Sequence, residues 1–329
     1  NYQLSDTSGT GELRLDNNVS SLVGLGQPET CSEVIGVVGR FFEIFQLLPR
    51  LEEDLSCAEE YIAPDTVVEI DKGEAFDIVT WNIQWFGDEA NSPAAGNVDS
   101  DLIQKDSVKT VISRLNADVY AVQEIADPIL FSQMVDELPG YDFILSDATS
   151  LPNTTGTKQQ VGFIYNTETI EVVETKVLLE SIHPFYNGGD ESALIDYPIE
   201  DKTRFYASGR LPFMLTANIT IDGTTEQVNI VNLHARANSG TDSQERYDMR
   251  KFDVEVLKDS LDANYGNTKL IVLGDYNDDV DETVADDVSA TTSTYEAYVN
   301  DTDNYNIVTS NLSDQGFRTF AFRENVIDH

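Results

Sequence analysis

The sequence is poor in positive charge. Its 329 residues include 20 lysines and arginines against 59 aspartates and glutamates, for a formal net charge of −39. Such a charge keeps a protein soluble and repels polyanions at long range, so tight non-specific binding to nucleic acid is not expected. A nuclease is not excluded, because acids that hold divalent cations present the charge of the metal to the substrate. The acidity also suits an extracellular or salty setting.

Cysteine is rarer still, and long apolar runs are missing. The two cysteines, Cys31 and Cys57, form no CxxC pair and have no histidine nearby. They favour one structural disulfide over a metal site, with two buried thiols as the alternative. No stretch approaches the ~20 apolar residues of a membrane-spanning helix. The first residues also lack the basic and apolar regions of a signal peptide, so a secretion signal is expected outside this sequence.

Turns and short apolar runs divide the chain near residue 65. Residues 1–65 hold strand-like runs such as "GELRL" and "GVVGRFFEIFQL", which predict a small β module. The module resembles part of the oligonucleotide/oligosaccharide-binding (OB) barrel of some secreted bacterial nucleases. The alternative is a β module that only packs against its neighbour. Residues 66–75 are rich in acids and are interpreted as a linker.

From residue 76 to residue 329, longer apolar strands alternate with helices. A hairpin is predicted over 210–235, with its turn at Asp222 and Gly223. Mixed hairpins and helix-linked strands indicate an α+β layered sandwich rather than a doubly wound parallel sheet. Helices are predicted over 100–115, 127–138 and 242–263. The first of them is expected to bury one face, made of Val108, Val111, Ile112 and Leu115.

Polar residues end four of the predicted strands. They are Asn82, Glu124, His234, and Asp275 together with Asn277. One such residue ordinarily makes a hydrogen bond or a turn, but four in one domain indicate a shared site. Acid and amide oxygens suit a hard cation such as Mg²⁺ or Ca²⁺. An imidazole beside them can move protons during attack on a phosphorus atom.

The motifs "WNIQ", "VQEI", "SGRLPF", "NLHA" and "GDYN" stand in the order found in a known superfamily. Residues 76–329 resemble the endonuclease/exonuclease/phosphatase superfamily, whose best-known member is deoxyribonuclease I. The resemblance implies a four-layer α/β sandwich that hydrolyses phosphoesters with Mg²⁺, Ca²⁺ or Mn²⁺. It implies that Glu124 is the principal metal carboxylate, and that Asn82 and Asp275 assist it.

The same resemblance implies roles for other residues. His234 is similar to the first catalytic histidine, and Asp275 to the residue that orients the water. Arg210 and Asn277 are expected to contact the substrate phosphate. Two departures weaken the expectation of duplex recognition. Ala126 stands near the place of an arginine that enters the minor groove, and a glutamine, at 159 or 160, replaces a glutamate that supports the first histidine.

The final residues, "NVIDH", match either of two late motifs of the superfamily. We assign Asp328 to the penultimate motif, "IDxI", and expect it to be catalytic, with "FRTFAFRE" as the strand before it. His329 is then a neighbour, and the second catalytic histidine and the closing strand are expected beyond this sequence. The domain would thus be truncated. The alternative is that His329 is itself the second catalytic histidine.

Three other features are interpreted without a catalytic role. His183 is expected to be a surface or hydrogen-bonding residue. The acidic run "DYNDDVDE" is expected to be a solvated loop, because it lacks the glycine spacing of a helix-loop-helix calcium site. Core packing is expected of at least one of Trp81 and Trp85.

The sequence therefore predicts a secreted, metal-dependent phosphodiesterase. A nuclease that acts on DNA rather than RNA is favoured, and no obligate protein partner is indicated. The alternatives are a phosphomonoesterase, a sphingomyelinase-like lipid phosphodiesterase, and a non-catalytic binding protein with a relict site.

Overall fold

The computed structural model describes residues 2–7, 9–15, 31–41, 44–57, 70–93, 99–238, 241–320 and 325–329. The chain forms two compact units, Asn1–Ile70 and Asp71–His329. Within the described ranges, no helix combines the length and the apolar character needed to cross a membrane.

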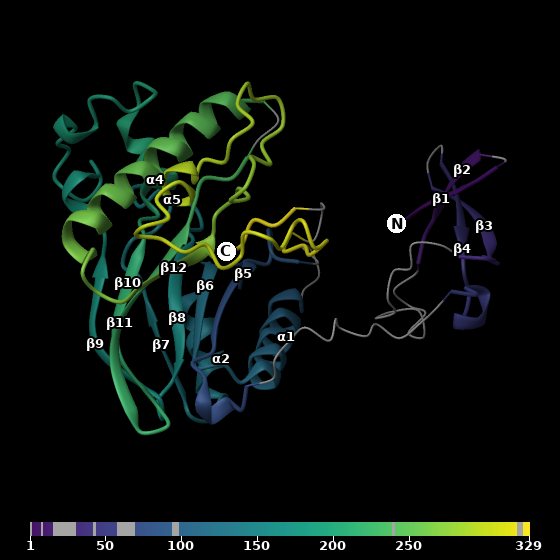
Figure 1. The fold of residues 1–329 in the computed structure, drawn as a ribbon, viewed down its shortest axis with the longest axis horizontal. Helices are drawn as coiled ribbons and strands as arrows, with labels where there is room; N and C mark the ends of the chain where they lie inside the picture. The colour runs from purple at the N-terminus through teal and green to yellow at the C-terminus, as the bar shows by residue number, and fades with distance from the viewer. Residues whose placement is uncertain are drawn as a thin grey trace. The chain divides into compact units, whose positions relative to one another are not determined.

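The first unit carries a four-stranded sheet of short strands, in the order β1-β2-β4-β3 (Figure 1). The middle pair, β2 and β4, is parallel, and the two outer pairs are antiparallel. The predicted β module is therefore present, whereas its assignment as an OB barrel stays a prediction. Residues 16–30, 42–43 and 58–69 lie outside the described part. The strands are β1 (Tyr2–Asp6), β2 (Gly9–Leu13), β3 (Val37–Phe41) and β4 (Ile44–Leu48).

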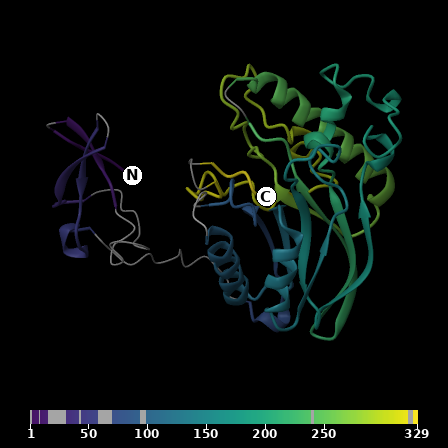
Figure 2. The same ribbon diagram turned by 180° about the vertical axis from the view of Figure 1, so that it is seen from behind.

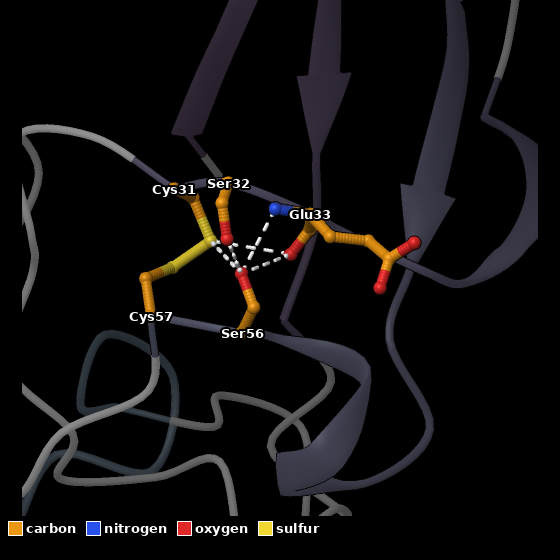
Figure 3. Close-up of a disulfide and its surroundings, with 5 residues drawn as sticks. All are labelled: Cys31, Ser32, Glu33, Ser56 and Cys57. Carbon is orange, nitrogen blue, oxygen red and sulfur yellow. Dashed lines mark hydrogen bonds between the residues drawn. A yellow bond between two sulfur atoms is a disulfide. The ribbon is translucent and has the colours of Figure 1, made fainter.

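A disulfide joins Cys31 and Cys57 in this unit, which confirms the prediction from the cysteine count (Figure 3). Beside it the Ser56 hydroxyl accepts the Glu33 backbone N–H at 2.8 Å and donates to the Glu33 carbonyl at 3.0 Å. Leu13 is the one large apolar side chain buried among the unit's described residues. A disulfide restricts the unfolded chain and thereby stabilises a unit of this size.

The second unit contains two four-stranded sheets. Their orders are β5-β6-β8-β7 and β12-β11-β10-β9. The β5·β6 and β11·β12 pairs are parallel and the remaining pairs antiparallel, as expected for a mixed α+β fold. The first sheet comprises β5 (Ile78–Phe86), β6 (Val119–Ile125), β7 (Tyr141–Leu145) and β8 (Gln160–Asn166). The second comprises β9 (Ile170–Val177), β10 (Phe213–Ile221), β11 (Thr224–His234) and β12 (Leu270–Asp275).

The two sheets pack face to face, with helices on their outer faces (Figures 1 and 2). Phe163, Leu215 and Ile230 belong to the apolar cluster between the sheets. Helices α1 (Ser100–Leu115) and α2 (Pro128–Asp136) cover the first sheet, and α4 (Ser243–Tyr265) covers the second. This arrangement has four layers. Shorter elements are α3 (Phe205–Gly209), α5 (Glu296–Val299) and 3₁₀ turns at Glu52–Asp54, Lys72–Glu74, Glu180–Ile182, Ser192–Leu194 and Lys202–Arg204.

Helix α1 has the predicted bounds but buries a different face. Val108 and Ile112 are buried, whereas Val111 and Leu115 are 37% and 51% exposed. The side chain of Gln104 donates to the carbonyls of residues 83 and 84 at the end of β5, at 2.8 and 2.7 Å. This anchor turns the row 104, 108, 112 toward the sheet. The expected four-residue apolar face is therefore wrong for two of its members.

Candidate active site

The carboxyl ends of β6, β11 and β12 and the middle of β5 bring four of the predicted site residues together. Asn82 donates through Nδ2 to Glu124 Oε1 at 3.0 Å and to Asp275 Oδ2 at 2.8 Å. His234 Nε2 lies 3.3 Å from Asp275 Oδ2 and 3.7 Å from Glu124 Oε1. Three carboxylate and imidazole groups from three strands thus converge on one point. Asn82 presents its amide nitrogen, rather than its oxygen, to the two carboxylates.

Residues with a left-handed backbone conformation near the strand ends orient these side chains. Gln84, Trp85, Glu124 and Asn277 have φ angles of 47°, 48°, 64° and 53°. Each such residue costs roughly 1–2 kcal/mol, and strain of this kind gathers at functional sites. In return, the Trp85 N–H donates to Glu124 Oε2 and the Gln84 N–H to Asn82 Oδ1, both at 2.9 Å. The turn within β5 therefore orients two of the site side chains.

Gly274 lets the last strand approach its neighbour. Its φ is 149°, and a Cβ there would lie 2.0 Å from the carbonyl oxygen of Leu233. Only glycine fits so close a backbone contact. The contact sets Asp275 opposite His234 in the parallel ladder. Asn277, two residues on, donates its backbone N–H to Asp275 Oδ1 at 2.9 Å and its side chain to the carbonyl of residue 235 at 3.1 Å.

Burial dominates the electrostatics of the site. It raises the pKa of Asp275, and repulsion from Asp328 adds to the effect. Burial also raises the pKa of Asp328. The pKa of His234 lies well below its usual value, because its ring is buried and the charge of Arg210 is near. The imidazole is therefore neutral at pH 7, beside carboxyl groups whose ionised form a nearby cation would stabilise.

The donor set fits a divalent cation. One ligand atom each from Glu124, His234 and Asp275 lies within 4.8 Å of the others. His234 Nδ1 and Asp328 Oδ1 are buried and have no hydrogen-bond partner in the described part of the chain. The carboxylates of Glu124 and Asp275 suit a hard cation such as Mg²⁺, Mn²⁺ or Ca²⁺, the ions that the sequence suggests, whereas the His234 imidazole is a ligand more typical of softer transition metals.

Arg210 lies under the site instead of at its opening. Its guanidinium donates to the carbonyls of His234 at 3.3 Å and Ala235 at 3.2 Å, and to the side chain of Gln159. Burial lowers its pKa to about 10, while attraction to Glu124 and other acids opposes the shift. Arg210 does not line the cavity described below. Its expected contact with substrate phosphate stays a prediction, and the contacts observed are with the backbone that carries His234.

A left-handed turn directs Arg210 to this position. Tyr206, Ala207 and Ser208, within α3, have φ angles of 40°, 50° and 63°. The turn is held by the loop around His183, whose Nε2 is 3.0 Å from the carbonyl of residue 205, and whose Nδ1 accepts the N–H of residue 185 at 3.0 Å. Tyr186 donates its hydroxyl to the carbonyl of residue 209 at 2.7 Å. His183 is expected from the sequence to be either a hydrogen-bonding or a surface residue. It makes hydrogen bonds, and its side chain is buried rather than on the surface.

The expectation that the acidic run after β12 is a solvated loop is wrong for Asp278 and Asp279, which are buried, and holds for Asp281 and Glu282, which are exposed. Asp278 is fully buried, 3.2 Å from Nη2 of Arg250, and it accepts the backbone N–H of Thr294 at 2.9 Å. Arg250 also donates to the carbonyl of Arg236 at 2.9 Å and to Asn238 Oδ1 at 2.7 Å. This ion pair joins the loops that follow β11 and β12, and no sequence motif predicted it. The available signal was the helical spacing of Arg250 with Val254, Leu257 and Leu261 on the buried face of α4.

Asp328 reaches the site and His329 does not. Asp328 forms an isolated antiparallel bridge with Asp275 and lines the cavity. The ring of His329 packs on Tyr276 with centroids 5.3 Å apart. Its Nδ1 is 2.8 Å from Thr309 Oγ1. Of the predicted strand before these residues, 317–320 are described and are not a strand, and 321–324 lie outside the description.

Asn82, Glu124, His234, Asp275 and Asp328 line a cavity of about 760 Å³. Glu124, Asp275, Asp286 and Asp328 are the acids that line it, and no lysine or arginine is among its described lining residues. Trp81, Trp85 and Phe320 contribute aromatic surface. A substrate in this cavity therefore meets carboxylates and aromatic rings around one histidine.

The sequence model of the Endonuclease/Exonuclease/phosphatase family matches residues 79–329. No curated protein sequence matches the chain. Among solved structures, an endonuclease/exonuclease/phosphatase family protein from Bacteroides thetaiotaomicron is 14% identical, with a TM-score of 0.44 over 68% of each chain. A mannosyl-6-phosphatase of the same organism is 14% identical, with a TM-score of 0.44 over 69% of this chain and 70% of its own. The human Nocturnin catalytic domain is 14% identical, with a TM-score of 0.47 over 77% and 80%.

Proposed function

We propose that the chain is a metal-dependent phosphodiesterase that cleaves nucleic acid. It belongs to the endonuclease/exonuclease/phosphatase family of phosphoester hydrolases. DNA is the favoured substrate over RNA, and the favoured location is outside the cell. The disulfide between Cys31 and Cys57 supports an oxidising compartment, and the net charge of −39 suits the same setting.

The convergence of Glu124, His234 and Asp275 carries this proposal. Their ligand atoms lie within 4.8 Å of one another, at the ends of three strands and on the wall of a cavity. Glu124 and Asp275 would hold the cation, and Asn82 aligns the two carboxylates through its hydrogen bonds to both. A bound divalent cation would supply positive charge next to a phosphate oxygen.

The protein's own groups would perform the proton transfers and the positioning. The neutral ring of His234 can take up a proton from the attacking water. Asn277 and Asp328 line the same cavity, where the first can donate to a phosphate oxygen and the second can orient water. Arg210 fixes the backbone of residues 234 and 235 and places a positive charge under the site.

Hydrolysis of a lipid phosphodiester is a second candidate, favoured by one observation. The described residues around the cavity include four acids and no lysine or arginine. A zwitterionic headgroup would meet less repulsion there than a polyanion does. A phosphomonoester dianion has the least support, since its additional negative charge would need a cationic partner.

The test is a panel of substrates with matched metal conditions. Plasmid, single-stranded DNA, RNA, sphingomyelin vesicles and p-nitrophenyl phosphate are each incubated with Mg²⁺, Mn²⁺, Ca²⁺ or a chelator. We expect cleavage of DNA with metal, none with chelator, and little with the Glu124→Gln variant. Cleavage of sphingomyelin alone would establish the second candidate. A protein inactive on every substrate would support the non-catalytic alternative.

A further inference from the structure

Trp85 differs from the other aromatic residues of the second unit in its surroundings. Its side chain is half-buried, lines the cavity, and belongs to none of the three apolar clusters. Trp81 lines the same cavity but packs against the cluster beneath α1 and α2. No ring contact or cation–π contact involving Trp85 is present in the described part of the chain. Its ring therefore contributes little to the core.

The backbone holds Trp85 next to the proposed metal carboxylate. Its φ of 48° is strained for a tryptophan. Its backbone N–H donates to Glu124 Oε2 at 2.9 Å, so the Trp85 side chain is attached to the backbone directly beside this carboxylate. A phosphate held near Glu124 and Asp275 would place whatever is esterified to it within reach of this ring. The turn that orients Glu124 therefore also places the Trp85 side chain on the wall of the cavity.

We propose that Trp85 forms a stacking subsite for the nucleobase beside the scissile phosphate. This inference rests on the proposed function and narrows its substrate to nucleic acid with unpaired bases. Stacking on an aromatic side chain needs a free base face, which a single strand offers and a closed duplex does not. Trp81 and Phe320 also line this cavity, and several rings together can hold a quaternary ammonium group. Cleavage of sphingomyelin is therefore measured beside that of two single strands.

The experiment compares two single strands of equal length and charge. One is an oligodeoxynucleotide, and the other carries abasic tetrahydrofuran sites in place of its nucleosides. We measure kcat/KM for both with Mg²⁺, in the wild type and in Trp85→Ala and Trp85→Phe. Stacking on one aromatic side chain contributes about 5- to 150-fold in kcat/KM. We expect the wild type to prefer the base-containing strand by a factor in this range.

The ratio of the two kcat/KM values is the decisive quantity. It should fall toward one in Trp85→Ala and be largely retained in Trp85→Phe, which keeps a flat ring. Ile129→Ala, which truncates an apolar side chain 72% exposed on α2 and outside the cavity, should retain the wild-type ratio. Circular dichroism and thermal unfolding show whether each variant is folded.

Each other outcome has a separate meaning. A wild type that cleaves both strands equally, or a Trp85→Ala variant that loses activity on both in proportion, overturns the stacking subsite and leaves the proposed function standing. A wild type that cleaves neither strand overturns the subsite, and the plasmid and RNA arms of the substrate panel then decide whether the proposed function stands. Selective loss of sphingomyelin cleavage in Trp85→Ala, with the strand ratio unchanged, would assign the ring to a choline headgroup instead.

Discussion

The two ends of the sheet sandwich in the second unit are built on different principles. At one end the β10–β11 hairpin turns through Asp222 and Gly223, both exposed, in an ordinary tight turn (Figure 1). At the other end Glu124, His234 and Asp275 lie partly or fully buried beside one another. We call these the hairpin end and the cleft end. The same β11 strand connects them.

The difference shows which part of the chain serves stability and which serves chemistry. Apolar residues between the two sheets, among them Val228 and Ile230 of β11, stabilise the fold beyond the exposed first residues of that strand. At the cleft end, buried charges and left-handed residues such as Gln84 and Glu124 oppose that stabilisation. A fold retains such groups at functional sites and offsets their cost elsewhere. Changes at the cleft end should therefore alter activity, and changes at the hairpin end should alter stability.

The largest expected effect is that of His234→Ala on catalysis. Removing a proton-transfer group should lower kcat by roughly 10²–10⁴-fold. Initial rates on single-stranded DNA with Mg²⁺ measure the loss, and circular dichroism checks the fold. Because the ring is buried, His234→Gln serves as a second variant that fills more of the space. A folded variant of either kind that keeps more than about a tenth of wild-type kcat would contradict the assignment.

Glu124→Gln should weaken binding of the cation. The substitution removes one carboxylate charge at nearly constant volume, and a divalent ion depends on that charge. We expect isothermal calorimetry to give a dissociation constant for Mg²⁺ or Mn²⁺ raised by roughly 10-fold or more, by analogy with the cost of losing a supporting group at a metal site. Metal should also raise the unfolding temperature of the wild type more than that of the variant. Equal affinities would remove Glu124 from the ligand set.

His183 should make stability depend on pH. Burial lowers its pKa from 6.5 to about 4. The unfolded imidazole takes a proton below pH 6.5 and the buried one only near pH 4. The stabilisation from a neutral His183 is therefore complete above pH 6.5 and is lost progressively as the pH falls toward 4. The difference between the two pKa values corresponds to an effect on the order of 3 kcal/mol.

His183→Gln isolates this contribution, because His234 and His329 titrate in both proteins and cancel. Denaturant unfolding between pH 4.5 and 7.5 should show that the wild type loses its advantage over the variant toward the acid side. Parallel curves across this range would show that the ring is protonated as easily in the folded state as in the unfolded one. They would also show that the turn before Arg210 does not depend on a neutral histidine.

The strand ends could be predicted from the sequence because their signals are local. An apolar run that stops at Glu124, His234 or Asp275 marks the end of a buried strand, whereas β5 continues past Asn82 to Phe86 with a shift in register. Parallel pairing then brings the ends of neighbouring strands to the same edge. The layered architecture follows from the same runs together with the helices between them.

The remaining features depend on contacts between segments distant in the sequence, or on backbone conformations that the residues themselves do not favour. Nothing in the residues Tyr206, Ala207 and Ser208 predicts a left-handed turn, so the burial of Arg210 could not be foreseen. Asp278 can be buried because Arg250, on α4, forms an ion pair with it. An acidic run read alone is expected to be solvated, since a buried carboxylate is costly until its partner is known.

The smallest effect should come from Gly223→Ala at the hairpin end. Gly223 has a φ of 71°, which strains any residue with a Cβ, although a Cβ there would meet nothing within 4 Å. The strain should lower the free energy of unfolding by about 1 kcal/mol, and the unfolding temperature of a unit this large by about 2–4 °C. Thr224→Ala, the adjacent substitution without a positive φ, is the matched control for thermal unfolding. Activity on single-stranded DNA should stay at the wild-type level, because the turn and His234 stand at opposite ends of β11. A loss of kcat in Gly223→Ala would mean that strain at the hairpin end is transmitted along β11 to the cleft end. It would contradict the expectation that changes at the hairpin end alter stability alone.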